Sequence, residues 1–136
     1  MELNQKEPLA AVMKRFGFGC YQLKARGFLG LAESGLDLRT CAIEDLEAIP
    51  GIGLKTSRFF VMHTRRNAQI SCLDVHILSW MRRRGYANIP EQTPSSKKRY
   101  LDIERKFLTL ANEMQVSPSK LDLYIWNQER SRKLER

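Results

Sequence analysis

Apolar residues recur at the three- and four-residue spacing of an α-helix along most of the chain, and the alternation typical of a strand is scarce. Glycines interrupt this spacing where helices have to end, as at Gly35 and Gly85. The pattern predicts an all-α fold of about six to seven helices. The first five are expected at residues 8–15, 21–33, 43–48, 55–66 and about 75–84, the fifth with Asp74 as its N-cap.

Two prolines mark the expected starts of the last two helices. Thr93 precedes Pro94 and Ser117 precedes Pro118, and a capping side chain followed by proline is typical of a helix N-terminus. The first of these helices has an apolar face made of Tyr100, Ile103, Phe107, Leu110, Ala111 and Met114. The charged tail, residues 129–136, is expected to fray.

The size and charge of the chain fit one compact, basic domain over residues 1–136. The 136 residues, 43% of them hydrophobic, suffice for one core but not for two full domains. The 23 lysines and arginines exceed the 15 aspartates and glutamates, which gives a formal net charge of +8. Such a charge attracts polyanions, with nucleic acid as the first candidate and an anionic membrane surface as the second. A basic protein can also lack a polyanionic partner.

The sequence does not indicate a membrane span, an export signal or a metal cluster. No stretch approaches the roughly 20 apolar residues of a span, and residues 1–8 are too polar for a signal peptide. We therefore expect an intracellular protein, in the cytoplasm and nucleoid or in a nucleus. Cys20, Cys41 and Cys72 form no CxxC pair, so we expect no iron–sulfur cluster, no other cofactor and mostly buried, reduced thiols.

The segment LEAIPGIGLKT, residues 46–56, carries the most information about function. Two expected helices flank a turn with Gly51 and Gly53. Glycine lets the backbone approach another surface closely, and the free N–H groups of the turn and the next helix can bind a phosphate oxygen. A bare PGxG would fit an ordinary helix–helix turn, but the full pattern in a basic chain favours a phosphate seat. The turn carbonyls are candidate ligands for a monovalent cation, at Glu47, Ile49 and Ile52.

This hairpin, at about residues 43–66, and the later segment Cys72-Leu73-Asp74-Val75-His76 together resemble a known family. The family is the helix-hairpin-helix–Gly/Pro–Asp DNA glycosylases, which include endonuclease III and the 8-oxoguanine glycosylases. Segments 100–104 and 121–126 look like the C-terminal helices of the compact prokaryotic and archaeal 8-oxoguanine glycosylases. The resemblance covers roughly residues 15–128, and the hairpin, lysine and aspartate are its specific part.

The resemblance implies a bifunctional DNA glycosylase/AP lyase of base excision repair, with Lys55 and Asp74 as catalytic residues. Lys55 would attack C1′ of the sugar of a flipped nucleotide and form a Schiff base, with strand cleavage by β-elimination. The amine must be neutral, and a helix N-terminus disfavours its charge. Asp74 would stabilise positive charge on the sugar and transfer protons. The alternatives are a phosphate-binding lysine and a plain N-cap.

The expected partner is double-stranded DNA with a damaged base or an abasic site. The DNA-binding candidates are Pro50, Gly51, Ile52, Gly53, Thr56, His76 and Arg82, and the base-pocket candidates are Phe16, Phe18 and Tyr21. His76 is explained equally well as a half-buried histidine. The arginines at 65–66 and 82–84 suit helix C-termini as well as phosphates. Trp80 and Trp126 lie on or beside apolar faces, which favours the core.

Residues 17–25 are similar to the segment that precedes the hairpin in the family. Compared with the family, the chain looks N-terminally shortened, since few residues precede this segment. A partner or self-association is therefore expected to replace the N-terminal helices. Among bases, 8-oxoguanine is preferred, while pyrimidine damage and mismatched thymine stay open. Two other functions remain: a non-catalytic DNA-binding module, and an enzyme that acts on modified bases in viral DNA. The pairing of Lys55 with Asp74 favours an enzyme, because a phosphate clamp has no use for it.

Overall fold

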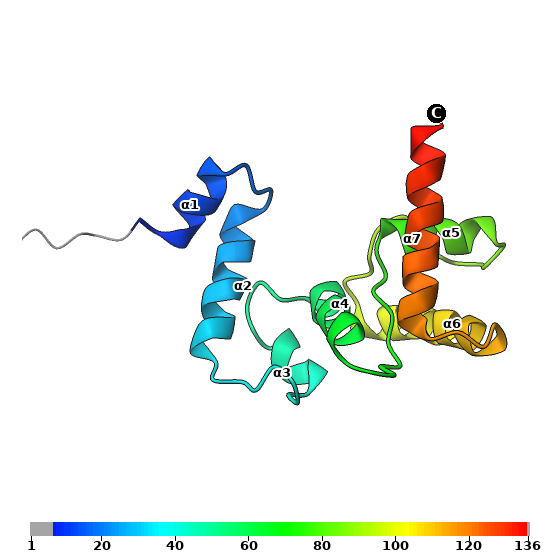
Figure 1. Ribbon diagram of the computed structural model, residues 1–136, viewed down its shortest axis with the longest axis horizontal. Helices are drawn as coiled ribbons and strands as arrows, with labels where there is room; N and C mark the ends of the chain where they lie inside the picture. The colour runs from blue at the N-terminus through cyan, green and yellow to red at the C-terminus, as the bar shows by residue number, and fades with distance from the viewer. Residues whose placement is uncertain (1–6, 136) are drawn as a thin grey trace, which may run out of the picture. The chain divides into compact units, whose positions relative to one another are not determined.

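The computed structural model describes residues 7–135, and within them it contains seven α-helices and no strand (Figure 1). The helices are α1 Leu9–Arg15, α2 Tyr21–Glu33, α3 Ile43–Glu47, α4 Leu54–Thr64, α5 Val75–Arg83, α6 Lys97–Glu113 and α7 Pro118–Leu134. The predicted all-α class is confirmed, with α3, the turn and α4 as the helix-hairpin-helix. None of the helices in the described part is long and apolar enough to cross a membrane.

The chain divides into two compact units, one ending at Gly53 and the other beginning at Leu54. In the N-terminal unit α1 packs on α2, and the turn after α3 also lies against α2. A Cβ added to Gly51 would lie 2.4 Å from the carbonyl oxygen of Leu23, and Gly51 has a φ of +94°. Only glycine meets both conditions, so Gly51 lets the turn reach α2. The prediction of a single domain stays a prediction.

The largest apolar core lies in the C-terminal unit, where α7 packs against α4, α5 and α6 (Figure 1). Its buried residues are Leu73, Ile77, Leu78, Trp80, Met81, Ile89, Tyr100, Ile103, Phe107, Leu110, Ala111, Leu121 and Ile125. The apolar face predicted for α6 is confirmed, except that Met114 at its end is exposed. Ser117 caps α7 through the N–H of Lys120, with Pro118 in the first turn, as predicted.

The predicted N-terminus of α6 is wrong. The helix begins at Lys97, and the hydroxyl of Ser96 accepts a hydrogen bond from the N–H of Arg99. Thr93 instead donates its hydroxyl to the carbonyl oxygen of Leu73 at 2.7 Å. A tertiary hydrogen bond therefore occupies the side chain that looked like the cap, and a serine three residues later takes that role.

The prediction that the tail frays from Glu129 is also wrong, because α7 continues to Leu134. Glu129 is buried, and its carboxylate forms an ion pair with Arg83 of α5. A buried carboxylate needs such a partner. The ion pair therefore holds the last turns of α7 against α5.

Candidate active site

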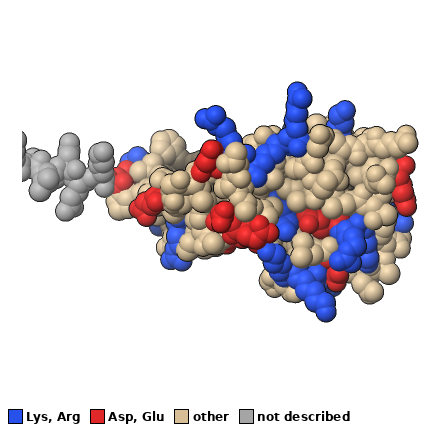
Figure 2. Space-filling model, turned by 90° about the horizontal axis from the view of Figure 1, so that it is seen from below, with Lys and Arg blue, Asp and Glu red and all other residues tan. Residues whose placement is uncertain are grey.

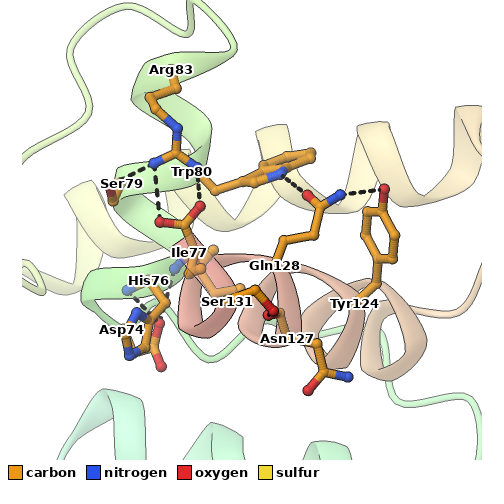
Figure 3. Close-up of polar contacts among 11 residues, drawn as sticks. Asp74, His76, Ile77, Ser79, Trp80, Arg83, Tyr124, Asn127, Gln128 and Ser131 are labelled. Atoms are coloured by element: carbon orange, nitrogen blue, oxygen red, sulfur yellow. Dashed lines mark hydrogen bonds and ion pairs between the residues drawn. The ribbon is translucent and has the colours of Figure 1, made fainter. Parts of the chain in front are cut away.

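Lys55 and Asp74 stand at the N-terminal ends of two helices of the C-terminal unit. Lys55 is the second residue of α4 and is exposed. Asp74 is the N-cap of α5, as predicted, and its Oδ1 accepts hydrogen bonds from the backbone N–H groups of His76 and Ile77, both at 2.9 Å (Figure 3). Because Oδ1 accepts both bonds, Oδ2 remains available for a ligand.

The buried thiol of Cys72 interacts electrostatically with both residues of the predicted pair. The pKa of Cys72 is raised to about 12, first by burial and then by the negative charges of Asp122 and Asp74, while the positive charge of Lys55 acts in the opposite direction. Lys55, Asp74 and Asp122 therefore all act electrostatically on one sulfur atom. With its pKa so high, the thiol stays neutral and is not a nucleophile near pH 7.

Asp122 of α7 is the functional candidate that the sequence interpretation missed. It is buried, and its pKa is raised to about 7, first by burial and then by the charge of Asp74. Its Oδ2 also lies 3.9 Å from Nε2 of His63 on α4. A carboxyl group with such a pKa can hold or release a proton near neutral pH. The sequence signal that could have found Asp122 is its position between two leucines, Leu121 and Leu123. In the structure Leu121 is part of the core.

The segment that leads into Asp74 is fixed by side chains of α6. The N–H of Ser71 donates to Oε2 of Glu104 at 2.8 Å. The hydroxyl of Tyr100 accepts from the N–H of Leu73 at 2.9 Å and donates to the carbonyl of Ser71 at 2.7 Å. All these groups are buried, so the bonds form out of competition with water. They define the position from which Asp74 begins α5.

A buried ion pair connects this segment to the helix that carries Lys55. Arg58, three residues after Lys55, donates its Nε to Oε2 of Glu104 at 2.9 Å. The same carboxylate oxygen holds Ser71, and the guanidinium lies 4.8 Å from the ring centroid of Tyr100. Glu104 thus joins the element of the amine to the element of the carboxylate. The sequence held no signal for this pair, since its members are 46 positions apart.

Exposed aromatic side chains lie beside the catalytic cluster, the name used here for the candidate residues Lys55, Asp74 and Asp122. Phe59, one turn after Lys55 on α4, is exposed, and its ring centroid is 4.6 Å from that of His63. Trp126 meets the ring of His76 edge-on at 5.3 Å. The prediction that Trp126 lies in the core is wrong, since its side chain is 38% exposed. It packs against the half-buried His76 instead of against the core. The prediction for Trp80 is confirmed by its burial.

The turn of the hairpin presents unsatisfied backbone donors. The N–H of Ile52 donates to the carbonyl of Ile49 at 3.0 Å, whereas no group in residues 7–135 accepts from the N–H of Gly51 or Gly53. The side chain of Ile49 is buried, and that of Ile52 is half-buried. Pro50, Gly51 and Gly53 are exposed, as a phosphate seat requires. The monovalent cation at the turn carbonyls stays a prediction.

The other predicted contact residues are spread over both units. Phe16 and Phe18 are exposed in the N-terminal unit, and Tyr21 there is half-buried. Thr56 is exposed on α4. Arg82 donates a guanidinium N–H to the carbonyl of Pro90, so the fold already uses part of this side chain. The DNA-contact and base-pocket roles of these residues stay predictions.

Comparison with known proteins identifies the family. The model of a family described as 8-oxoguanine DNA glycosylase matches residues 5–116. An 8-oxoguanine DNA glycosylase/AP lyase of Picrophilus torridus is 36% identical over 84 residues, covering 60% of this chain and 37% of that protein. One of Saccharolobus islandicus is 28% identical and covers 91% of this chain and 65% of that protein.

A solved structure supports the same assignment. The crystal structure of the 8-oxoguanine DNA glycosylase of Thermotoga maritima matches with a TM-score of 0.72 and 31% identity. The match covers 87% of this chain and 60% of that one, and the chain spans 37% and 65% of the two curated relatives above. Because the family model matches well over half of its residues, the chain belongs to the 8-oxoguanine DNA glycosylase family, with the helix-hairpin-helix fold.

Proposed function

We propose that this protein is a DNA glycosylase with AP-lyase activity that works through a Schiff base on Lys55. The observation that carries the proposal is the placement of an exposed amine, the N-cap carboxylate Asp74 and the buried carboxyl Asp122 around one thiol. Relatives that the chain matches over part of their length are named as 8-oxoguanine DNA glycosylase/AP lyases. A site of action inside the cell is part of the proposal.

The proposed chemistry uses each charged group of the cluster. The neutral amine of Lys55 attacks C1′ while the damaged base leaves with the electron pair of the glycosidic bond and takes up a proton. Asp74, through the oxygen that caps no N–H, stabilises positive charge on the sugar. Loss of a proton from the amine and opening of the sugar ring give the Schiff base. Removal of the C2′ proton then expels the 3′ phosphate and cleaves the strand.

Asp122 is proposed as the proton reservoir of this sequence of steps. Its pKa of about 7 lets it exchange a proton near neutrality, and the electrostatic contact with Asp74 links its protonation state to the catalytic carboxylate. In this role Asp122 would take up or release a proton that has to move while the amine of Lys55 reacts.

The proposed substrate is duplex DNA that contains 8-oxoguanine or an abasic site. The base must leave the stack to reach Lys55, and the exposed faces of Phe59 and Trp126 offer stacking surfaces beside the cluster. The N–H groups of Gly51 and Gly53 are proposed to hold a backbone phosphate. Roles in DNA or base contact are also proposed for Phe16, Phe18, Tyr21, Thr56, His76 and Arg82.

Borohydride trapping tests the function. Wild-type protein, Lys55→Gln, Asp74→Asn and the control Lys98→Gln, an exposed lysine of α6, are incubated with duplexes containing 8-oxoguanine or an abasic site. A covalent complex is expected for wild type and Lys98→Gln, none for Lys55→Gln, and much slower formation for Asp74→Asn. Trapping on the abasic site alone would retain the lyase and remove 8-oxoguanine as the substrate.

The second candidate is a non-catalytic DNA-binding module, which the unsatisfied N–H groups of the hairpin favour. Such a module would bind intact and abasic duplexes with equal affinity and equal salt dependence. Retained duplex binding without trapping on either substrate would refute the lyase and leave this module.

A further inference from the structure

Basic side chains stand out at several separate places in the view of Figure 2, with acidic side chains between them. One group of basic residues lies away from the catalytic cluster, in a groove of about 630 Å³ between α5 and α7. Its lining includes Trp80, Arg83, Arg84, Tyr124, Gln128 and Arg132. A volume of this size lies within the range of ligand-binding clefts.

The groove carries an excess of positive charge. Arg83 is ion-paired with the buried carboxylate of Glu129. Arg84 lies over the ring of Trp80 at 4.4 Å, and neither Arg84 nor Arg132 has an acidic partner among residues 7–135. Two guanidinium groups are thus available for an anion, and guanidinium suits phosphate oxygens.

A chain of hydrogen bonds orders the polar wall of the groove (Figure 3). Nε1 of Trp80 donates to Oε1 of Gln128 at 3.2 Å, and Nε2 of Gln128 donates to the hydroxyl oxygen of Tyr124 at 2.6 Å. Because that oxygen accepts from Gln128, its own proton is free to be donated. Trp80 is buried beneath Arg84, so it offers no stacking face. The groove therefore presents donors and positive charge, which match a phosphodiester better than a base.

The groove lies at a defined distance from the catalytic cluster. Asp74 and Arg84 flank the two ends of α5, and ten residues of helix rise about 15 Å. A DNA strand advances about 3.4 Å per nucleotide along its axis, so 15 Å corresponds to about four nucleotides. On α7, Tyr124 is two positions after Asp122, about 200° around the helix. The groove and the cluster thus use different faces of α7.

We propose that this groove binds backbone phosphates of the DNA about four nucleotides from the one that Lys55 attacks. The proposal rests on the proposed function, because it takes the same duplex as the ligand. It adds a second contact region, which extends the recognised length of DNA beyond the flipped nucleotide.

The proposal predicts that the affinity for DNA depends on the length of the duplex, and that this dependence requires the groove residues. Binding to duplexes with an uncleavable tetrahydrofuran abasic analogue is measured by fluorescence anisotropy, with either flank shortened from eight base pairs to two. Wild type is expected to lose affinity when one particular flank is shortened. The double variant Arg84→Gln/Arg132→Gln is expected to bind long and short duplexes alike, because its contact beyond the lesion is gone.

Salt dependence gives a second readout with a matched control. Each phosphate contact contributes about 0.9 to the slope of log affinity against log salt, so losing two contacts lowers the slope by about 1.8. Wild-type affinity then falls about tenfold more than that of the variant between 0.05 and 0.2 M salt. The control Arg99→Gln/Arg105→Gln removes two exposed charges of α6 and is expected to keep the slope and length dependence of wild type.

Further measurements separate a failure of the groove proposal from a folding defect and from a failure of the proposed lyase. Thermal unfolding checks that the variant folds, and Arg132→Lys in place of Arg132→Gln is expected to restore part of the slope. Identical length dependence and slope in variant and wild type would overturn the proposal. So would saturable binding of deoxyguanosine monophosphate or inorganic phosphate that is lost in the variant while duplex binding is unchanged. If wild type fails to trap abasic DNA but the groove effects remain, only the proposed lyase fails.

Discussion

At the residue scale, the two groups beside the proposed catalytic pair, Cys72 and Asp122, have pKa values that are set by their surroundings. Burial keeps the thiol of Cys72 neutral, and burial beside Asp74 raises the pKa of Asp122 to about 7. Asp74 is the N-cap of α5, and its Oδ1 accepts two backbone N–H groups, which leaves Oδ2 for a ligand. The two aspartates therefore differ in their surroundings: Asp74 is half-buried at a helix N-terminus, and Asp122 is buried.

Asp122→Asn is expected to change the pH dependence of stability. The folded protein keeps a proton on Asp122 up to about pH 7, whereas the unfolded chain releases it near pH 4. The contribution of protonated Asp122 to the free energy of unfolding is therefore fully present below pH 4 and is lost as the pH rises to 7. The loss is up to about 4 kcal/mol, reduced by the remaining solvent contact. Asp122→Asn, which cannot ionise, is expected to avoid it.

Thermal unfolding of both proteins from pH 4 to pH 9 measures this effect. The groups facing Asp122 are His63, Cys72 and Asp74, so Asp102→Asn, at an exposed aspartate of α6, serves as the control for charge removal. Melting curves of wild type and Asp122→Asn that shift in parallel with pH would contradict the assigned titration.

Gly51→Ala is expected to destabilise the protein by about 1–3 kcal/mol. The positive φ of Gly51 disfavours any side chain, and the added Cβ would meet backbone atoms of Leu23 and Gly27, which cannot move aside cheaply. The matched control is Gly53→Ala, where a Cβ meets nothing within 4 Å. Denaturant titration measures both variants, and equal stability losses would show that the turn does not depend on its approach to α2.

At the scale of elements, the site depends on how helix ends are held. Asp74 begins α5, and the residues before it are bound by Tyr100 and Glu104 of α6. Arg58 ties α4 to the same glutamate. Each helix end is thus positioned by a side chain from another helix, and this would preorganise the proposed amine and carboxylate for reaction.

Glu104→Gln is expected to lower the free energy of unfolding by about 3 kcal/mol, since it removes the charge of one partner of the buried ion pair with Arg58. It is also expected to slow Schiff-base trapping on an abasic duplex, even at a temperature at which the variant is fully folded. Denaturant titration and trapping rates provide the two measurements. As a control, Asp102→Asn breaks an exposed pair on the same helix and should leave both unchanged.

At the scale of the whole molecule, the two units differ in the size of their cores. In the N-terminal unit the buried apolar residues are Met13, Ala25, Cys41, Leu46 and Ile49, whereas the cluster described above fills the C-terminal unit. The catalytic cluster and the groove between α5 and α7 both belong to the better-packed unit. The glycine-rich turn belongs to the unit with the smaller core.

Hydrogen exchange is expected to separate the two units. Amides of α1 and α2 should exchange at least tenfold faster than those of α5, α6 and α7, because fewer buried apolar contacts oppose their opening. Mass spectrometry of peptides from each helix measures the rates, with unfolded protein as the reference for intrinsic exchange. Uniform protection factors across both units would show instead that they open together.

Local patterns in the sequence were enough for the features that depend on neighbouring residues. The all-α class follows from helical spacing, and Asp74 and Ser117 are N-caps as predicted, because a cap bonds to N–H groups two or three residues away. The turn glycines were predicted for the same reason, and the resemblance to the family was carried by the same short motifs.

Only the tertiary structure decided the features that join residues far apart in the chain. Arg58 and Glu104 are 46 positions apart, and Ser71 and Glu104 are 33 apart. Even a local choice, Ser96 over Thr93 as the cap of α6, follows from a hydrogen bond to distant Leu73. Burial, and with it the pKa of a group such as Asp122, is set by what packs around a side chain, and packing is a property of the whole fold.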